Sequence, residues 1–372
     1  MITFKIIADF QTQNRFYVDN KDIWVYEDNA LWNTGNKFHF WKYVKLDTDT
    51  QLEAGKQYIF PIFWDSSPEF MIQVISYVKE NILAFTNKTL IPVFIDHLEG
   101  NNGVAERVDY FVKTFYGSIP TFLINADYRL NNRKNLFEFM YVDQWEHHVI
   151  PESNIVGYQP DKLYINLNRV SRAHRCLLLQ SIIDNGMVTD GYTTWANTGN
   201  AYARYFIEHP NSTINNYTYD ILDVDDITTA NPTSTIPLEY CKKSFVYLVT
   251  ETHVNIEQLF ISEKSYKPIS IGMPFMILGN PGTLDLLHTK GYITFNKWFN
   301  ENYDQDLLLD KRIKIMMENL DYIKGLTDTQ RVDLRQEMMP ICRHNLEVYK
   351  MHQRKNSYLE LLESIMQRAQ LK

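Results

Sequence analysis

The sequence predicts an α/β protein built from two parallel, doubly wound sheets. Short apolar runs alternate with helical patterns, and the alternation stops once, over 149–160, where turn-forming residues dominate, before it begins again. The length of 372 residues fits two domains at roughly 150 residues each. The strand-like runs are apolar throughout, as expected for parallel strands covered by helices on both faces.

In the first half, apolar runs predict three strands, over 58–64, 89–95 and 119–126. The first run ends at Asp65, which begins an Asp-Ser-Ser-Pro turn. Helical spacing of apolar residues predicts helices over 70–80 and about 104–116.

The second half repeats this alternation. Strands are predicted over 162–167, 245–249, 274–278 and 291–295, and helices over 172–185, 262–271 and 283–288. Ser262 is a suitable N-cap, and the polar stretch 207–235 is predicted to be a loop. From about residue 304 we expect three helical segments, the last over about 345–369.

These elements predict two facing Rossmann-like domains, 1–150 and 158–345. The C-terminal helix, 346–372, would cross back onto the first domain or form a dimer contact; the oligomeric state is left open. In such sheets ligands bind beyond the carboxyl ends of the strands. Candidate functional residues are therefore expected directly after strands.

Composition excludes several classes of protein. With 45% hydrophobic and 22% charged residues the chain is globular and not disordered. No apolar run approaches membrane-spanning length, and the apolar stretch that ends at Asp9 is too short to predict a signal peptide. The widely spaced Cys176, Cys241 and Cys342 form neither a disulfide framework nor a zinc motif, which predicts a cytoplasmic location. A net charge of −8 disfavours broad nucleic-acid binding but leaves room for a local basic cleft.

A first basic cluster runs from Asn166 to Arg175, from the end of a strand into a helix. Between positions 155 and 180 there are four basic residues and one acid, which reverses the overall charge balance; the basic ones are Lys162, Arg169, Arg172 and Arg175. Guanidinium groups at a helix start can bind phosphate. A solvated basic turn is an equally good interpretation, and His174 alone indicates a structural role.

A second cluster follows a later strand and loop. Glu263 could accept hydrogen bonds from both hydroxyls of a ribose, while Lys264 and Lys267 could contact phosphate. The spacing alone favours an ordinary surface pair between Glu263 and Lys267.

The order of these residues resembles a known family. Phe245 to Thr252, then Ile261-Ser262-Glu263-Lys264, then Gly272-Met273-Pro274 resemble the donor-binding motif of alpha-1,3-fucosyltransferases and related GT-B glycosyltransferases. Asn168 to Arg175 is similar to an N-R-x-x-R-x-H-R segment of phage and large-virus glycosyltransferases. The chain departs from the first motif in two places. It has Thr252-His253 where the family has Asn-Ser, and its Gly272-Met273-Pro274 is one residue shorter than the family's Gly-x-x-Pro. The resemblance covers about 160–305.

The resemblance implies a GT-B fold and a nucleotide-sugar donor such as a GDP- or UDP-sugar. Glu263 would hold the ribose, Glu251 the sugar, and Lys264 the diphosphate, assisted by Arg172 or Arg175. Tyr247 and Tyr266 would pack near the base. The predicted donor-binding set is Asn168, Arg169, Arg172, Arg175, Tyr247, Glu251, Glu263, Lys264 and Lys267.

Catalysis would need a base to take the proton of the acceptor hydroxyl. Carboxylates that follow strands in the first half are the candidates: Asp96 with Glu99 first, then Asp65. Each is also explained as a helix cap or turn residue. Positive side chains would replace a metal cofactor, so we expect none. The acidic stretch 223–226 has the letters of a metal-binding Asp-x-Asp but lies in a predicted loop.

The sequence thus predicts an inverting, metal-independent glycosyltransferase acting on a glycan. One alternative is a phage-type enzyme that glycosylates hydroxymethylated pyrimidines in DNA, which would work in the host cytoplasm. Another is a protein that binds a nucleotide or glycan without turnover.

Overall fold

The structure is a computed structural model that covers the chain in part. It describes the following residues: 2–5, 44–47, 58–63, 72, 75–76, 78–95, 104–116, 119–125, 127–128, 136–140, 161–168, 170–195, 200–219, 236–305, 307–353, 364 and 367–368. Contacts divide the chain into two compact units. Unit 1 comprises residues 1–144 and 355–372, and unit 2 comprises residues 145–354.

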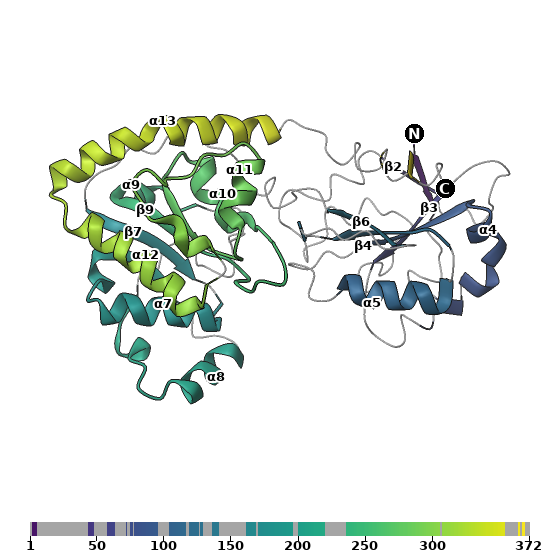
Figure 1. The fold of residues 1–372 in the computed structure, drawn as a ribbon, viewed down its shortest axis with the longest axis horizontal. Helices are drawn as coiled ribbons and strands as arrows, with labels where there is room; N and C mark the ends of the chain where they lie inside the picture. Colours follow the sequence, from purple (N-terminus) through teal and green to yellow (C-terminus); the bar gives the residue numbers. More distant parts are fainter. Residues whose placement is uncertain are drawn as a thin grey trace. The chain divides into compact units, whose positions relative to one another are not determined.

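Unit 1 contains a parallel sheet of six described strands in the order β2-β1-β3-β4-β5-β6 (Figure 1). The strands are β1 (Ile2–Lys5), β2 (Val44–Asp47), β3 (Tyr58–Phe63), β4 (Leu90–Ile95), β5 (Thr121–Asn125) and β6 (Leu136–Met140). The predicted strands over 58–64, 89–95 and 119–126 are confirmed as β3, β4 and β5. Its helices include α4 (Ile82–Thr86) and α5 (Val104–Phe111), which continues as a π-helix (Val112–Tyr116) where a helix was predicted.

Unit 2 is built on a parallel sheet of four described strands in the order β10-β9-β7-β8. They are β7 (Lys162–Asn168), β8 (Gly191–Trp195), β9 (Ser244–Thr250) and β10 (Phe275–Leu278). Every residue of β9 and β10 is buried, which explains why both segments are apolar almost throughout. The predicted strands over 162–167, 245–249 and 274–278 are confirmed.

Helices cover both faces of this sheet. They are α7 (Ala173–Asp184), α8 (Asn200–Glu208), α9 (Leu238–Lys243), α10 (Glu263–Ser270), α11 (Thr283–Thr289), α12 (Leu309–Lys324) and α13 (Asp328–Gln353). Helix α12 packs on α7, and α13 packs on α10 (Figure 1). The predicted N-cap is confirmed, because the Ser262 hydroxyl accepts a hydrogen bond from the backbone N–H of Lys264. None of the described helices is long and apolar enough to cross a membrane.

The order of the strands creates a topological switch point between β7 and β9. From β7 the chain passes through α7 to β8 on one side, whereas from β9 it passes through α10 to β10 on the other. At such a point the two connections diverge, which leaves a crevice at the carboxyl ends of the two central strands. The first sequence cluster, Asn166 to Arg175, lies there at the end of β7, and the second, Phe260 to Phe275, follows the loop after β9.

The strand predicted over 291–295 is wrong. The backbone N–H and C=O of Ile293 pair with the side-chain amide of Asn345 on α13, and the N–H of Phe295 pairs with Glu301. Tyr292 and Phe295 are buried, which explains the apolar pattern that suggested a strand.

The C-terminal helices also differ from the prediction. From residue 309 two long helices, α12 and α13, occupy the region up to 353, and residue 345 lies inside α13 and not at a helix start. Residues 364 and 367–368 are helical, and the guanidinium of Arg368 lies 5.2 Å from the ring centroid of Phe137 within unit 1.

Strand β8 begins against an aromatic ring. A Cβ at Gly191 would lie 2.2 Å from the Cζ atom of Tyr164, so a side chain at position 191 has no room. The Tyr164 hydroxyl donates a hydrogen bond to the carbonyl of Met187, 3.1 Å away, which fixes the ring in place. The thiols of Cys176, Cys241 and Cys342 are buried and free.

Candidate functional site

Buried amides connect the strands at the switch point. The Asn166 amide donates to the carbonyl of Leu248 on β9 at 2.6 Å, and the Thr250 hydroxyl donates to Asn168 Oδ1 at 2.6 Å. The Asn168 amide donates to Asn166, and its backbone N–H donates to Thr194 Oγ1 on β8 at 3.0 Å. These bonds cross from β8 through β7 to β9 and fix the strand ends that border the crevice.

Glu251 comes directly after β9, and its buried carboxylate accepts four hydrogen bonds. Oε1 accepts from the backbone N–H of Ser262 at 3.0 Å and from the Ser265 hydroxyl at 2.5 Å. Oε2 accepts from the Ser262 hydroxyl at 2.6 Å and from the backbone N–H of Thr252 at 3.2 Å. The carboxylate therefore attaches the start of α10 to the end of β9.

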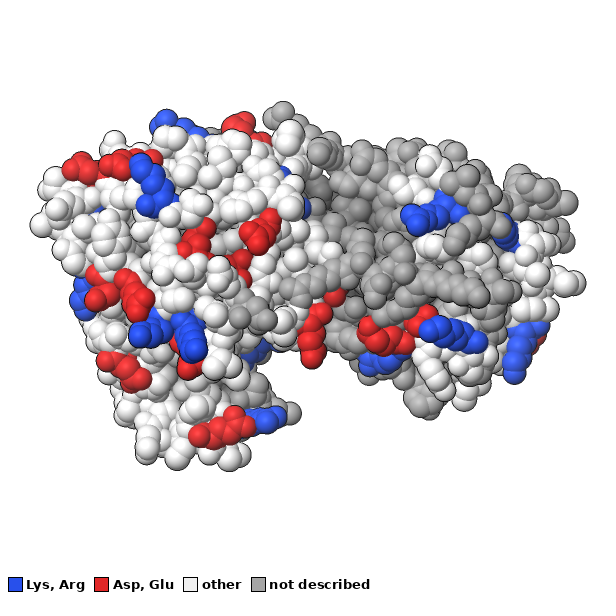
Figure 2. Space-filling view, in the orientation of Figure 1, with Lys and Arg blue, Asp and Glu red and all other residues white. Residues whose placement is uncertain are grey.

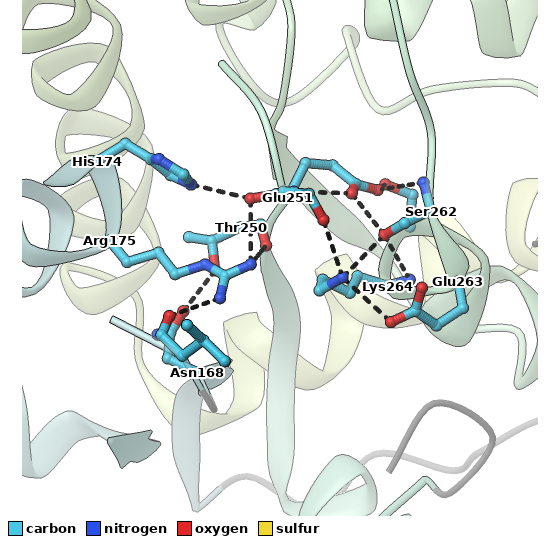
Figure 3. A network of polar contacts seen from close by, with 11 residues as sticks. Asn168, His174, Arg175, Thr250, Glu251, Ser262, Glu263 and Lys264 are labelled. Atoms are coloured by element: carbon cyan, nitrogen blue, oxygen red, sulfur yellow. Dashed lines mark hydrogen bonds and ion pairs between the residues drawn. The ribbon is translucent and has the colours of Figure 1, made fainter. Parts of the chain in front are cut away.

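The backbone carbonyl of Glu251 is held from the opposite side by the start of α7 (Figure 3). His174 Nε2 lies 2.8 Å from this oxygen and one nitrogen of Arg175 lies 3.2 Å from it. Because a carbonyl oxygen only accepts, Nε2 carries the proton of a neutral imidazole. Burial and the neighbouring charge of Arg175 lower the pKa of His174 to about 3.

The side chain of Arg175 is turned toward the backbone of its own chain. Its side chain is buried, and it donates to the backbone carbonyls of Val170 at 2.7 Å and Thr250 at 3.4 Å, besides Glu251. The guanidinium thus braces the chain around the crevice. A contact with a phosphate would require it to exchange these bonds.

Lys264 projects from the first turn of α10 and meets the same network (Figure 3). Its ammonium donates to Thr252 Oγ1 at 3.2 Å, Ser262 Oγ at 3.1 Å and Glu263 Oε1 at 3.1 Å. The structure therefore brings both sequence clusters together around Glu251, with Arg175 on one side and Lys264 on the other.

Glu263 is a buried carboxylate with one unused oxygen. The residue is 5% exposed, and within the described part of the chain Oε2 has no hydrogen-bond partner. Burial alone would raise the pKa of Glu263, but the charges of Lys264 and Lys267 outweigh it and lower the pKa below its ordinary value. The carboxylate is thus ionised, and a ligand hydroxyl could donate to Oε2.

The other predicted donor-binding residues take different positions. Arg172 is the half-buried N-cap residue of α7, at the carboxyl end of β7. Tyr247 lies inside β9 in the core, and Lys267 is buried within α10. The remaining predictions lie outside the described residues: Arg169, Asp65, Asp96, Glu99 and the acidic stretch 223–226.

Sequence reasoning gave no role to several members of this network, although Asn166 and Ser265 lie within its two clusters. Asn166 and Thr194 lie inside strands and Ser265 lies inside α10, so no motif marked them as functional. Thr252 appeared only as a departure from the family motif, yet its N–H and hydroxyl contact Glu251 and Lys264. A detectable signal was the run of polar residues in otherwise buried strands, which requires internal hydrogen-bond partners.

The surface charges of unit 2 are largely paired with neighbours. Figure 2 shows acidic and basic side chains interspersed over the described part of one face. Exposed pairs within helices include Arg204–Glu208 and Lys242–Glu239. Within the described residues, no group of three or more His, Cys, Asp or Glu side chains could hold a metal ion.

Comparisons with known proteins give little similarity. No family model and no curated protein matches the chain. Two chains of solved structures match, and one of them is "T4 phage BGT in complex with UDP and Mn2+". The match has 10% sequence identity and a TM-score of 0.36, and covers 87% of this chain and 86% of that chain. A likeness at this level is too low to indicate a family or an activity.

Proposed function

We propose that unit 2 binds a nucleotide sugar at the carboxyl ends of β7 and β9, and that the chain is a glycosyltransferase. The observation that carries the proposal is the meeting of two separate clusters at the switch point of a parallel sheet. There, the ammonium of Lys264 pairs with a buried carboxylate, Glu263, which has one open acceptor oxygen, and Arg172 lies at the start of α7, after the neighbouring strand β7. Cations and a hydroxyl acceptor are the groups that a ribose diphosphate requires.

The fold supports this placement independently of the residue types. In open parallel sheets, ligands bind in the crevice outside the strand ends at a switch point, where helix N-termini add positive potential. Both α7 and α10 begin there. A GT-B arrangement of two such domains, as the sequence resemblance implies, is part of the same proposal.

The proposed reaction is a displacement at the anomeric carbon of the donor sugar. The acceptor hydroxyl oxygen forms the new bond to that carbon, the bond to the diphosphate oxygen breaks, and the diphosphate leaves with the electron pair. Arg172 and Lys264 would neutralise the charge that develops on the leaving group. The hydroxyl proton goes to a base, for which Asp96 with Glu99, and then Asp65, remain the predictions.

Titration calorimetry with UDP and GDP tests donor binding. The wild type should bind at least one of them, and Lys264→Gln should weaken that binding by about tenfold or more, since a charged hydrogen bond is lost. Lys242→Gln is a suitable control, because its ammonium also pairs with a glutamate but on the exposed surface. Absence of binding by any nucleoside diphosphate would refute the proposal.

Turnover and acceptor need separate assays. Slow hydrolysis of a nucleotide sugar without acceptor, persisting in excess EDTA, is expected from a metal-independent transferase and not from a non-catalytic binding protein. Transfer of labelled sugar to oligosaccharides, compared with duplex DNA containing hydroxymethylated pyrimidines, would separate the proposed glycan acceptor from the DNA alternative.

A further inference from the structure

The ammonium of Lys264 is fully engaged inside the protein. A lysine ammonium has three N–H donors, and three oxygens accept from it: those of Thr252, Ser262 and Glu263. The Ser262 hydroxyl is equally saturated, since it donates to Glu251 and accepts from the backbone N–H and the ammonium of Lys264. A phosphate can therefore bind Lys264 only if one of these acceptors releases it.

Among the three acceptors, Glu263 is the one that a ligand can draw away. Thr252 and Ser262 are neutral hydroxyls fixed by the loop and the helix cap, whereas Glu263 is an ionised carboxylate whose second oxygen is vacant. It neutralises the ammonium, with 3.1 Å between Nζ and Oε1; the Glu263 side chain is buried and that of Lys264 is 25% exposed. Within this arrangement the pair offers little net positive charge to an anion.

We propose that Glu263 acts as a gate on Lys264, so that the site selects ligands that carry both a vicinal diol and a diphosphate. The inference rests on the proposed function and adds a rule of selection to it. One hydroxyl of the ligand would donate to the vacant Oε2 and the other to Oε1. These two hydrogen bonds would draw the carboxylate away from Nζ, which would then turn an N–H to the phosphate. Inorganic pyrophosphate has no vicinal diol to open the pair and is excluded.

The test is calorimetry with inorganic pyrophosphate and UDP or GDP on the full-length wild type and on Glu263→Gln. The neutral amide keeps the size of the side chain but holds the ammonium weakly. The variant should bind pyrophosphate about tenfold more tightly than the wild type, as expected when a charged hydrogen bond no longer competes. It should also bind the nucleoside diphosphate more weakly. Glu239→Gln, which breaks an exposed pair with Lys242, should change neither affinity.

A double variant separates a gate from a general charge effect. If Glu263→Gln strengthens pyrophosphate binding by releasing the ammonium of Lys264, it should not strengthen that binding in a protein that already carries Lys264→Gln. An equal gain in that background would overturn the inference, as would unchanged or weaker pyrophosphate binding by a variant that melts like the wild type.

Different results would refute the gate and the proposed function. If the wild type binds a nucleoside diphosphate and Glu263→Gln gains no pyrophosphate affinity, the gate is refuted and the donor site stands. If no nucleoside diphosphate binds but the variant gains pyrophosphate affinity through Lys264, then Glu263 does mask Lys264, but the nucleotide-sugar function and the selection that depends on it are refuted.

Discussion

Replacing Glu251 with glutamine should destabilise unit 2 strongly, although the two side chains have nearly the same shape. Each carboxylate oxygen accepts one backbone N–H and one hydroxyl: Oε1 from Ser262 and Ser265, and Oε2 from Thr252 and Ser262. The NH₂ group of glutamine accepts nothing. Whichever oxygen it replaces, one buried N–H and one hydroxyl lose their acceptor.

The magnitude follows from that count. A buried N–H without an acceptor costs about 1–3 kcal/mol, and a hydroxyl costs less because it can rotate toward another oxygen. We therefore expect Glu251→Gln to lower the free energy of unfolding by about 2–4 kcal/mol. Because Ser262 positions Lys264, the variant should also bind a nucleoside diphosphate more weakly under conditions in which it remains folded.

Equilibrium urea unfolding followed by circular dichroism measures this loss. Glu239→Gln is the matched control, since its carboxylate is exposed and solvent screens its pair with Lys242, so the free energy of unfolding should change little. A loss below about 1 kcal/mol for Glu251→Gln, with an unchanged denaturant dependence, would show that the four hydrogen bonds do not hold α10 to β9.

Three further predictions concern pH and the segment that replaces a strand. Burial raises the pKa of Asp304 from 3.8 to about 7, so the folded state retains a proton that the unfolded state has lost, and stability should fall as pH rises between these values. Asp304→Asn should abolish this decline, as thermal melts at pH 5 and pH 8 would reveal. His174 acts in the opposite direction. Its pKa is lowered from 6.5 to about 3, so on acidification His174 takes up a proton in the unfolded state before it does so in the folded state. The stability of the wild type should therefore fall as the pH drops from 6.5 to about 3. His174→Gln should lose less over the same range in urea titrations; an equal decline would contradict this assignment. Asn345→Ala removes both partners of the Ile293 backbone and should cost about 1–3 kcal/mol, with faster amide exchange at that residue.

Much of the fold could be predicted because buried parallel strands have a distinctive sequence pattern. Apolar runs located β3, β4, β5, β7, β9 and β10, and a capping serine located the start of α10. Strand β8 was missed because Gly191-Tyr-Thr-Thr-Trp is short and has no aliphatic run, although its residue types suit a strand, and its polar threonines find partners only within the sheet. The segment 291–295 has the apolar pattern of a strand, but Asn345, 52 positions away, takes its backbone hydrogen bonds.

The sequence was enough to locate the site, but it did not show which of its residues contact a ligand and which hold the site in shape. Strand ends and charge patterns placed Asn168, Glu251 and Lys264 in one region, and the structure brings them together. The direction in which a side chain points is not encoded by its spacing, however. Arg175 has the right position for a phosphate ligand, yet its guanidinium turns to carbonyls of the chain. Only the tertiary arrangement distinguishes a residue that contacts a ligand from one that shapes the site.

The close approach of Gly191 to the ring of Tyr164 has an evolutionary consequence. Because a side chain at 191 and a tyrosine at 164 cannot coexist, neither position can change freely while the other is kept. In homologous sequences the two sites should covary, with a larger residue at the start of β8 accompanied by a smaller one in β7. Such paired substitutions would reveal this strand register in relatives too divergent to align by their motifs.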